Sequence, residues 1–395
     1  MQKKLIALAV AGLVSGGAYA QASNVTIYGT LDVNVNSLNT GYGSKFSVGN
    51  GGLSASRLGF RGEEALGSGM KAIFVLEAGL NMDNQSAGGA APTLGINQTT
   101  ASSSASPGNQ GQLFSRQGFA GLGGNFGELT FGRQYTGSYI GLAVMMDPVG
   151  GGLYGGPLVT ATPTALPARF NNSIVYKTPT MAGFRGHLTY TTGAENNVNA
   201  DTAVLATTTN DKAGRGYDLA LMYGNGPING ILSTWDYNSN SWVTAGETGL
   251  AKRSGWALGG NYDFGVAKLH AGYISAKIKG GNYENISVTS NSTAVWSLGV
   301  VVPVGSAGRV VFNASAMNDK TTQDRDFNVW GLSYLHDLSK RTTAYANYGK
   351  LKNNSNSVAS LMTGGDVLGT TIGAANTATA GYDPSGLMVG VRHMF

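Results

Sequence analysis

The sequence predicts an all-β fold: a transmembrane antiparallel β-barrel of about 16 strands. Three observations predict it: segments in which apolar and polar residues alternate, connections that alternate in length along the chain, and the absence of a long apolar run after residue 20. Soluble sandwiches do not confine long loops to every second connection, whereas outer-membrane barrels have short turns on one side and long loops on the other. A chain without an apolar helix can span a membrane only as a closed barrel.

Residues 1–20 are predicted to be a cleaved secretory signal peptide. Lys3 and Lys4 form a basic start, a short apolar core follows, and Ala18-Tyr-Ala20 is a small-x-small cleavage site. The alternative, a buried N-terminal helix, is disfavoured because the apolar run is too short to span a bilayer and ends in the cleavage pattern.

The exported chain, residues 21–395, is predicted to be a single barrel domain. It would carry 24 basic and 21 acidic residues, a net charge of +3, and this small, dispersed surplus does not indicate nucleic-acid binding. The chain has no cysteine, which excludes disulfides and cysteine-based sites. Charged residues are only 12% and glycine numbers 61, but 18 Tyr, 13 Phe and 5 Trp exceed what a disordered chain usually carries.

The first predicted strand, residues 24–36, shows the alternation most clearly. Val25, Ile27 and Leu31 fall on one face, and Thr26 and Asp32 on the other. The same period gives the other predicted strands: 53–63, 70–80, 113–122, 126–135, 169–178, 183–194, 214–224, 228–238, 253–264, 266–279, 292–303, 308–318, 325–337, 340–351 and 385–395. The apolar faces would meet lipid and the polar faces would line a water-filled channel, so the barrel would need no apolar interior.

The connections include one candidate functional segment. Long connections are predicted at 37–51, 81–112, 136–168, 195–211, 239–252, 280–292 and 353–383, with an intermediate one at 319–325. Segment 136–168 is rich in Gly and Pro, with Asp147 as its only acid and no basic residue. A structureless stretch of this length usually marks a functional loop. We hypothesise that it folds into the barrel mouth and narrows it; the alternative is an ordinary outside loop.

Several motifs resemble those of the Gram-negative general porins, the trimeric 16-stranded class. They span essentially the whole mature chain: VTIYGTLD at 25–32, SRLGFRGEE at 56–64, AIFVLEAGL at 72–80, SRQGFAGL at 115–122, GELTFGRQ at 127–134, RFNNSIVY at 169–176 and RHMF at 392–395. The resemblance implies an outer-membrane homotrimer without a cofactor, a third extracellular loop folded into the lumen, and an eyelet where loop acids face barrel arginines. It also implies contact with outer-membrane lipid and lipopolysaccharide, and use of Phe395 as the C-terminal signature read by the barrel-assembly machinery.

Strand parity indicates which arginines would line the lumen as a basic wall. The candidates are Arg57, Arg61, Arg116, Arg169, Arg133 and Arg185. Arg169 is placed inward because Phe170 and Ile174 share the opposite, lipid-facing parity. Arg133 shares parity with the apolar Phe131 and would face lipid or the trimer contact unless its strand bulges. The alternative is that these arginines are merely solvated or paired with nearby glutamates.

A basic wall in a narrow pore concentrates anions and repels cations. Because segment 136–168 supplies a single acid, Asp147, the sequence predicts passive diffusion of small hydrophilic solutes and ion transport with a weak anion preference. The alternatives are a substrate-specific channel with an internal solute-binding site, a secreted adhesin and an enzyme. A continuous aromatic track in the lumen would favour the specific channel, and solubility without detergent would favour the adhesin.

Enzymatic activity is not predicted. A hydrolase in such a barrel needs a Ser/His/acid or His/Asp cluster, and the chain has four histidines: His187, His270, His336 and His393. His336 and His393 would face outward near the periplasmic end. His187 and His270 would line the lumen without a visible catalytic partner. No phosphate loop, metal-ligand spacing or catalytic carboxylate pair appears, so neither a metal nor a catalytic residue is predicted.

Overall fold

The computed structural model describes residues 24–40, 43–80, 82, 113–161, 164, 166–193, 214–238, 251–280, 282–283, 286–287, 290–361 and 380–395. The predicted signal peptide, residues 1–20, lies outside them, as does most of the long connections predicted at 81–112, 195–211, 239–252 and 353–383. Among the described residues, no helix is both long enough and apolar enough to cross a membrane.

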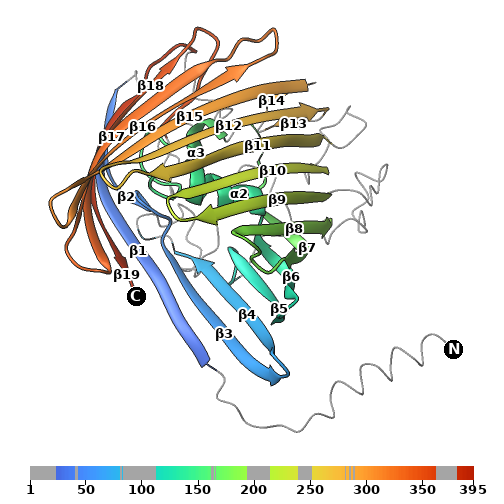
Figure 1. Cartoon of the computed structure of the whole chain (residues 1–395). Coiled ribbons are helices and arrows are strands. Elements are labelled where there is room, and N and C mark those ends of the chain that lie inside the picture. Colours follow the sequence, from blue (N-terminus) through green and yellow to red (C-terminus); the bar gives the residue numbers. More distant parts are fainter. Residues whose placement is uncertain are drawn as a thin grey trace.

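Within this described part, 16 strands form a closed antiparallel barrel, which confirms the predicted fold class (Figure 1). The strands are β1 (Asn24–Asn39), β3 (Arg57–Gly67), β4 (Met70–Gly79), β5 (Gln117–Gly124), β6 (Gly127–Tyr135), β7 (Arg169–Lys177), β8 (Phe184–Thr192), β9 (Arg215–Asn225), β10 (Ile228–Asn238), β11 (Lys252–Asp263), β12 (Lys268–Lys279), β15 (Ser290–Val304), β16 (Gly308–Asp319), β17 (Phe327–Asp337), β18 (Thr342–Asn353) and β19 (Ser385–Met394). Each pairs with the next in this order.

The barrel closes where β1 pairs with β19, in register from Thr30 opposite Met394 to Asn39 opposite Ser385. Just beyond, Gly29 and Phe395 exchange two backbone hydrogen bonds, of 3.0 and 3.1 Å. The Phe395 ring lies over the α-carbon of Gly29, where a Cβ would overlap it. The C-terminal aromatic residue therefore completes the seam between the first and last strands.

Deletion of Phe395 is expected to lower the yield of folded barrel, because it removes two ladder hydrogen bonds and a ring contact at the seam. Heat-modifiable mobility on semi-native electrophoresis measures the folded fraction. Met394→Leu keeps the chain length and is the matched control. A deletion variant that folds as well as this control would contradict the expectation.

The prediction of one uninterrupted loop over 37–51 is wrong. Strand β2 (Ser44–Asn50) lies within it and pairs with the second half of β1, while β3 pairs with the first half. A hairpin of β13 (Asn282–Tyr283) and β14 (Ile286–Ser287) likewise lies within the connection predicted at 280–292. Gly, Ser and Asn flank both segments, and these residues are typical of loops, which concealed the short strands.

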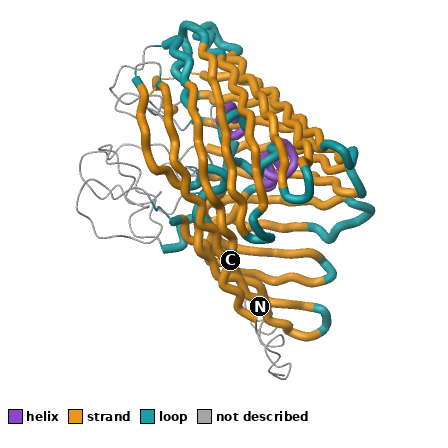
Figure 2. Tube along the Cα trace, turned by 90° about the vertical axis from the view of Figure 1, so that its left-hand side faces the viewer, coloured by secondary structure: helices purple, strands orange, loops and turns teal. Residues whose placement is uncertain are grey.

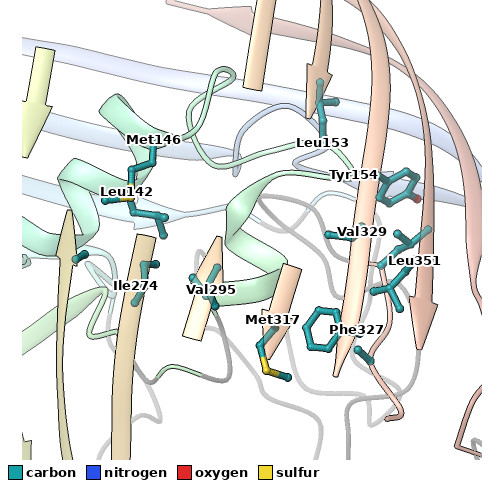
Figure 3. Packing of buried hydrophobic residues seen from close by; sticks show 14 of the residues in the cluster. Leu142, Met146, Leu153, Tyr154, Ile274, Val295, Met317, Phe327, Val329 and Leu351 are labelled. Atoms are coloured by element: carbon teal, nitrogen blue, oxygen red, sulfur yellow. The ribbon is translucent and has the colours of Figure 1, made fainter. Parts of the chain in front are cut away.

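The expectation that the barrel needs no apolar interior is also wrong. Among the described residues, short helices follow β6, namely α2 (Gly137–Gly141), η1 (Leu142–Met146) and α3 (Pro157–Ala161), and Figures 1 and 2 show them enclosed by the strands. Apolar side chains of this segment pack against inward-facing apolar side chains of the wall; Figure 3 labels Leu142, Met146, Leu153, Tyr154, Ile274, Val295, Met317, Phe327, Val329 and Leu351. Burying these side chains away from water stabilises the segment.

Candidate functional site: the segment inside the barrel and the basic wall

The two ends of segment 136–168 are tied together. Thr136 donates its backbone N–H to Ala168 O at 3.2 Å and its hydroxyl to Pro167 O at 2.5 Å. The same hydroxyl oxygen accepts a hydrogen bond from the N–H of Tyr139 at 3.2 Å and thereby caps α2. The segment thus leaves and rejoins the wall at one place, between β6 and β7.

Polar side chains of β9, β11 and β12 hold the first half of the segment. Asp218 of β9 accepts a hydrogen bond from the N–H of Ser138 at 3.2 Å. The carbonyl oxygen of Met145 lies 3.1 Å from both Asn261 Nδ2 of β11 and His270 Nδ1 of β12. His270, for which the sequence shows no catalytic partner, thus binds the backbone of the segment.

The second half of the segment is held on the far side of the barrel. Asn347 of β18 accepts from the N–H of Tyr154 at 2.8 Å and donates to its carbonyl oxygen at 3.5 Å. Leu153 donates its N–H to Gly52 O, before β3, at 2.7 Å. The anchors therefore run from β9 through β11 and β12 to β18 and the start of β3.

Glycines on the inward strand faces make room for the segment. Met146 lies over Gly259 and Gly272, where a Cβ would come within 2.6 Å of Met146 Cγ and 2.8 Å of Met146 Sδ respectively. Tyr154 lies in the same way over Gly349 and Gly386. At these positions a larger residue would displace the segment from the wall.

The predicted arginines lie on a different part of the barrel wall, where none of these strand residues holds the segment. Arg116 donates to Glu77 Oε1 at 2.8 Å and to the hydroxyl oxygen of Tyr135 at 2.5 Å. Arg169 donates to the same hydroxyl oxygen at 2.8 Å. Tyr135, at the end of β6, therefore holds two of the predicted arginines side by side.

Tyr135 also joins the wall to the inner segment, because its ring stacks on Tyr139 at 5.3 Å between centroids with 5° between planes. The Arg169 guanidinium lies 4.4 Å from the Tyr135 ring centroid. Parity could not single out Tyr135, since it is the last residue of its strand. In the sequence, its position next to a predicted functional loop is the feature that could have marked Tyr135 as a site residue.

Arg133 lies beside a bulge in the ladder between β6 and β7, within electrostatic range of Arg116 and Arg169. The register with β7 shifts between Gly132 and Gln134, and Gly132 and Asn172 have positive φ angles of 130° and 46°. Arg133 donates to Ser115 O at 2.6 Å and also binds Asn171.

The bulge overturns the parity argument used for Arg169. Phe170, expected to face lipid, is 6% exposed, and its ring packs edge-on against Tyr237. Asn171 and Asn172 of β7 lie opposite a single residue of β6, Arg133, so one extra residue breaks the period of two there.

Arg57 and Arg61 of β3 lie around Tyr28 of β1. The Arg61 guanidinium is 5.5 Å from the Tyr28 ring centroid, and Arg57 lies within electrostatic range of Tyr28 and Tyr139. Tyr28 donates its hydroxyl to Glu77 Oε2 at 3.0 Å. The basic wall, as the term is used below, consists of Arg57, Arg61, Arg116, Arg133 and Arg169.

The structure does not bring Arg185 into the basic wall. Its guanidinium lies 3.6 Å from Glu128, near the short turn that joins β7 and β8. The inner face also carries arginines outside the predicted set: Arg309 pairs with Asp337 at 2.6 Å, and Arg392 lies within electrostatic range of Asp32 and of Arg57. The parity test applied to β16 and β19 would have found both.

Asp147, the predicted constriction-loop acid, points into its own segment. It is 2% exposed and accepts a hydrogen bond from the N–H of Val149 at 2.8 Å. Burial raises the pKa of Asp147 to about 7. This carboxyl group therefore shapes the turn after η1 and forms no ion pair with the basic wall among the described residues.

We expect the seating of segment 136–168 to weaken as pH rises. The buried Asp147 carboxyl has a pKa of about 7, against the ordinary 3.8 that it regains in a released segment, so the seated state holds its proton more tightly. The stabilisation is complete below the ordinary pKa and declines as pH rises toward 7. Single-channel current noise should therefore increase from acidic to neutral pH. Asp147→Asn should flatten this profile, and an unchanged profile would contradict the assignment.

Among the described residues, no group of three or more His, Cys, Asp or Glu side chains could hold a metal ion. His336 and His393 are exposed near short turns, as parity predicted.

Comparisons with known proteins agree with this architecture. Residues 7–356 match the family described as Gram-negative porin. The chain is 32% identical to the outer membrane porin protein 32 of Delftia acidovorans over the full length of both chains. It is 30% identical to an outer membrane porin protein of Bordetella pertussis, covering 90% of this chain and 95% of that protein. The solved structure of an anion-selective porin from Comamonas acidovorans has a TM-score of 0.70 and 28% identity, covering 94% of this chain and all of that one.

Proposed function

Because the chain belongs to the Gram-negative porin family, we propose that its barrel is narrowed by segment 136–168 and that solutes pass between this segment and the basic wall. The family membership establishes the general function that the sequence predicted. The protein is an outer-membrane porin of a Gram-negative bacterium, a water-filled channel for passive diffusion of small hydrophilic solutes and ions.

The position of the anchors supports the proposed path. The segment is bound to β9, β11, β12 and β18, and its apolar side chains fill the space beside those strands. Water and solutes are excluded from that packed half. The remaining passage lies along β3 to β7, where the basic wall lies.

The charge of this passage supports a weak anion preference. The basic wall has five arginines and one engaged carboxylate, Glu77, while Asp147 is turned away. In a narrow, partly desolvated pore such a surplus raises the local concentration of anions. The relative from Comamonas acidovorans is itself described as an anion-selective porin.

We further propose that the protein works as a homotrimer, that Phe395 serves as its assembly signature, and that it has no catalytic activity. Its relatives are channels. The alternative of a substrate-specific channel would need a continuous aromatic track. At the basic wall, the ring–ring contact among the described residues is the single stack of Tyr135 on Tyr139.

Reversal potentials in planar bilayers under a salt gradient test the proposal. A weakly anion-selective channel should shift the zero-current potential toward the equilibrium potential of chloride. Clear cation selectivity would overturn the role of the basic wall, and absence of conductance would overturn channel function.

A further inference from the structure

The side of segment 136–168 that is not packed against the wall is apolar. Over residues 139–150, all of which the structure describes, the one charged side chain is that of Asp147, and it is buried. The residues of this stretch with partly or largely exposed side chains are Tyr139, Ile140, Ala143, Val144, Pro148 and Val149. The hydroxyl of Tyr139 is the single polar group among these side chains. The segment therefore presents hydrocarbon, and not acids, to the water inside the barrel.

Val144 has the most exposed of these side chains. It is 62% exposed, whereas Leu142, Met145 and Met146 of the same short helix, η1, are buried in the packed interior. Ile140 precedes Val144 by four residues, about one helical turn, and so lies on the same side of the segment. Because η1 contacts β10, β11, β12 and β15 with its other side, Ile140 and Val144 point toward the open passage. The apolar face, as the term is used below, consists of Ile140, Ala143 and Val144.

Tyr139 brings the apolar face next to the basic wall. It precedes Ile140 in the chain, and its ring stacks on that of Tyr135. The hydroxyl oxygen of Tyr135 in turn binds Arg116 and Arg169. A solute in the passage therefore meets guanidinium groups on one side and hydrocarbon on the other.

We propose that, among equally charged anions, the passage favours those that carry a short hydrocarbon group: monocarboxylates whose carboxylate pairs with the basic wall while the hydrocarbon rests on the apolar face. This inference rests on the proposed function, because it needs solutes to pass between segment 136–168 and the basic wall. Charge alone does not distinguish two monovalent anions of equal size. Contact with the apolar face does, because it removes hydrocarbon of both partners from water.

The two contacts act together and remain weak enough for permeation. Arginine pairs with a carboxylate through two parallel N–H groups and so orients it, which leaves the rest of the solute free to reach the opposite side of the passage. The apolar face offers part of the surface of three small side chains. Covering it with one methyl group therefore raises permeability by a small factor and does not trap the solute.

The test compares isobutyrate with lactate in planar bilayers that contain the refolded full-length protein. The two anions have the same charge and nearly the same size, but lactate has a hydroxyl where isobutyrate has a second methyl group. Reversal potentials with one sodium salt on each side give their permeability ratio. Wild-type protein should favour isobutyrate about threefold. Ile140→Thr/Val144→Thr, which exposes hydroxyl groups in place of hydrocarbon, should bring the ratio close to unity.

Two single variants keep this test decisive. Val144→Thr alone changes one mostly exposed side chain and should give an intermediate ratio even if the double variant folds poorly. Val302→Thr makes the same replacement on the outer face of β15, where Trp296 and Leu298 share its parity, and is the matched control. It should keep the wild-type ratio.

A wild-type ratio near unity, an unchanged ratio in both threonine variants of the apolar face, or an equal loss in the control would overturn the inference. Reversal potentials in sodium chloride separate it from the proposed function. Protein that prefers chloride to sodium but treats the two carboxylates alike defeats only this inference. Protein that does not conduct, or that prefers sodium, defeats the proposed function.

Discussion

Replacing Arg116 and Arg169 together by glutamine is expected to lower the anion-to-cation permeability ratio several-fold and to bring it to or below unity. Both guanidinium groups lie at the hydroxyl of Tyr135, facing the proposed passage. A unit charge about 8 Å from a permeating ion contributes about 2 kcal/mol at an effective dielectric constant near 20. Salt screens part of this energy, so the effect should be largest at low ionic strength. Reversal potentials at two salt concentrations measure it.

Two variants make this experiment specific. Arg185→Gln removes the same type of charge near a short turn, beside Glu128, and should change the ratio little. Tyr135→Phe keeps the ring stack on Tyr139 but removes the shared acceptor, and should give an intermediate loss. If the double variant retains wild-type selectivity, the basic wall does not select ions.

Replacing Tyr154 and Asn347 together by alanine is expected to raise single-channel conductance by about half or more and to add current noise. The change removes the ring seated over Gly349 and both side-chain hydrogen bonds that hold the far end of the segment. A released segment occupies less of the wall and fluctuates into the passage.

Asn313→Ala is the control for this variant. Asn313 is a buried inward-facing asparagine on β16, two strands from β18, whose side-chain amide forms no hydrogen bond among the described residues. Its loss should leave conductance unchanged. Wild-type conductance in the Tyr154/Asn347 variant would show that the distal anchor does not define the opening.

The barrel could be predicted from the sequence because a strand between lipid and water must alternate. Each strand of the described ring ends within four residues of its predicted bounds. The rule fails where the backbone leaves the regular ladder. At Asn171–Asn172 two residues of β7 oppose one residue of β6, and this single extra residue reverses the parity of Phe170; a bulge of this kind has no signature in the pattern of apolar residues.

The site was less predictable because its contacts join distant parts of the chain. Parity selected arginines that face inward but could not show that Arg116 and Arg169 share Tyr135, or that Arg185 lies elsewhere. The anchors on Asp218 and Asn347 are 80 and 193 residues from their partners. The alternation of apolar and polar residues shows which face of a strand points inward. It does not show whether water or another segment of the chain covers that face. The apolar packing inside the barrel was therefore not predicted.

The large sequence separation of Tyr154 and Asn347 has a consequence for the order in which the barrel folds. Their hydrogen bond joins residues 193 positions apart, so it cannot form before β18 has been synthesised and placed in the wall. Contacts of such high sequence separation form late. The position of segment 136–168 is therefore fixed late in folding, once β18 has joined the wall.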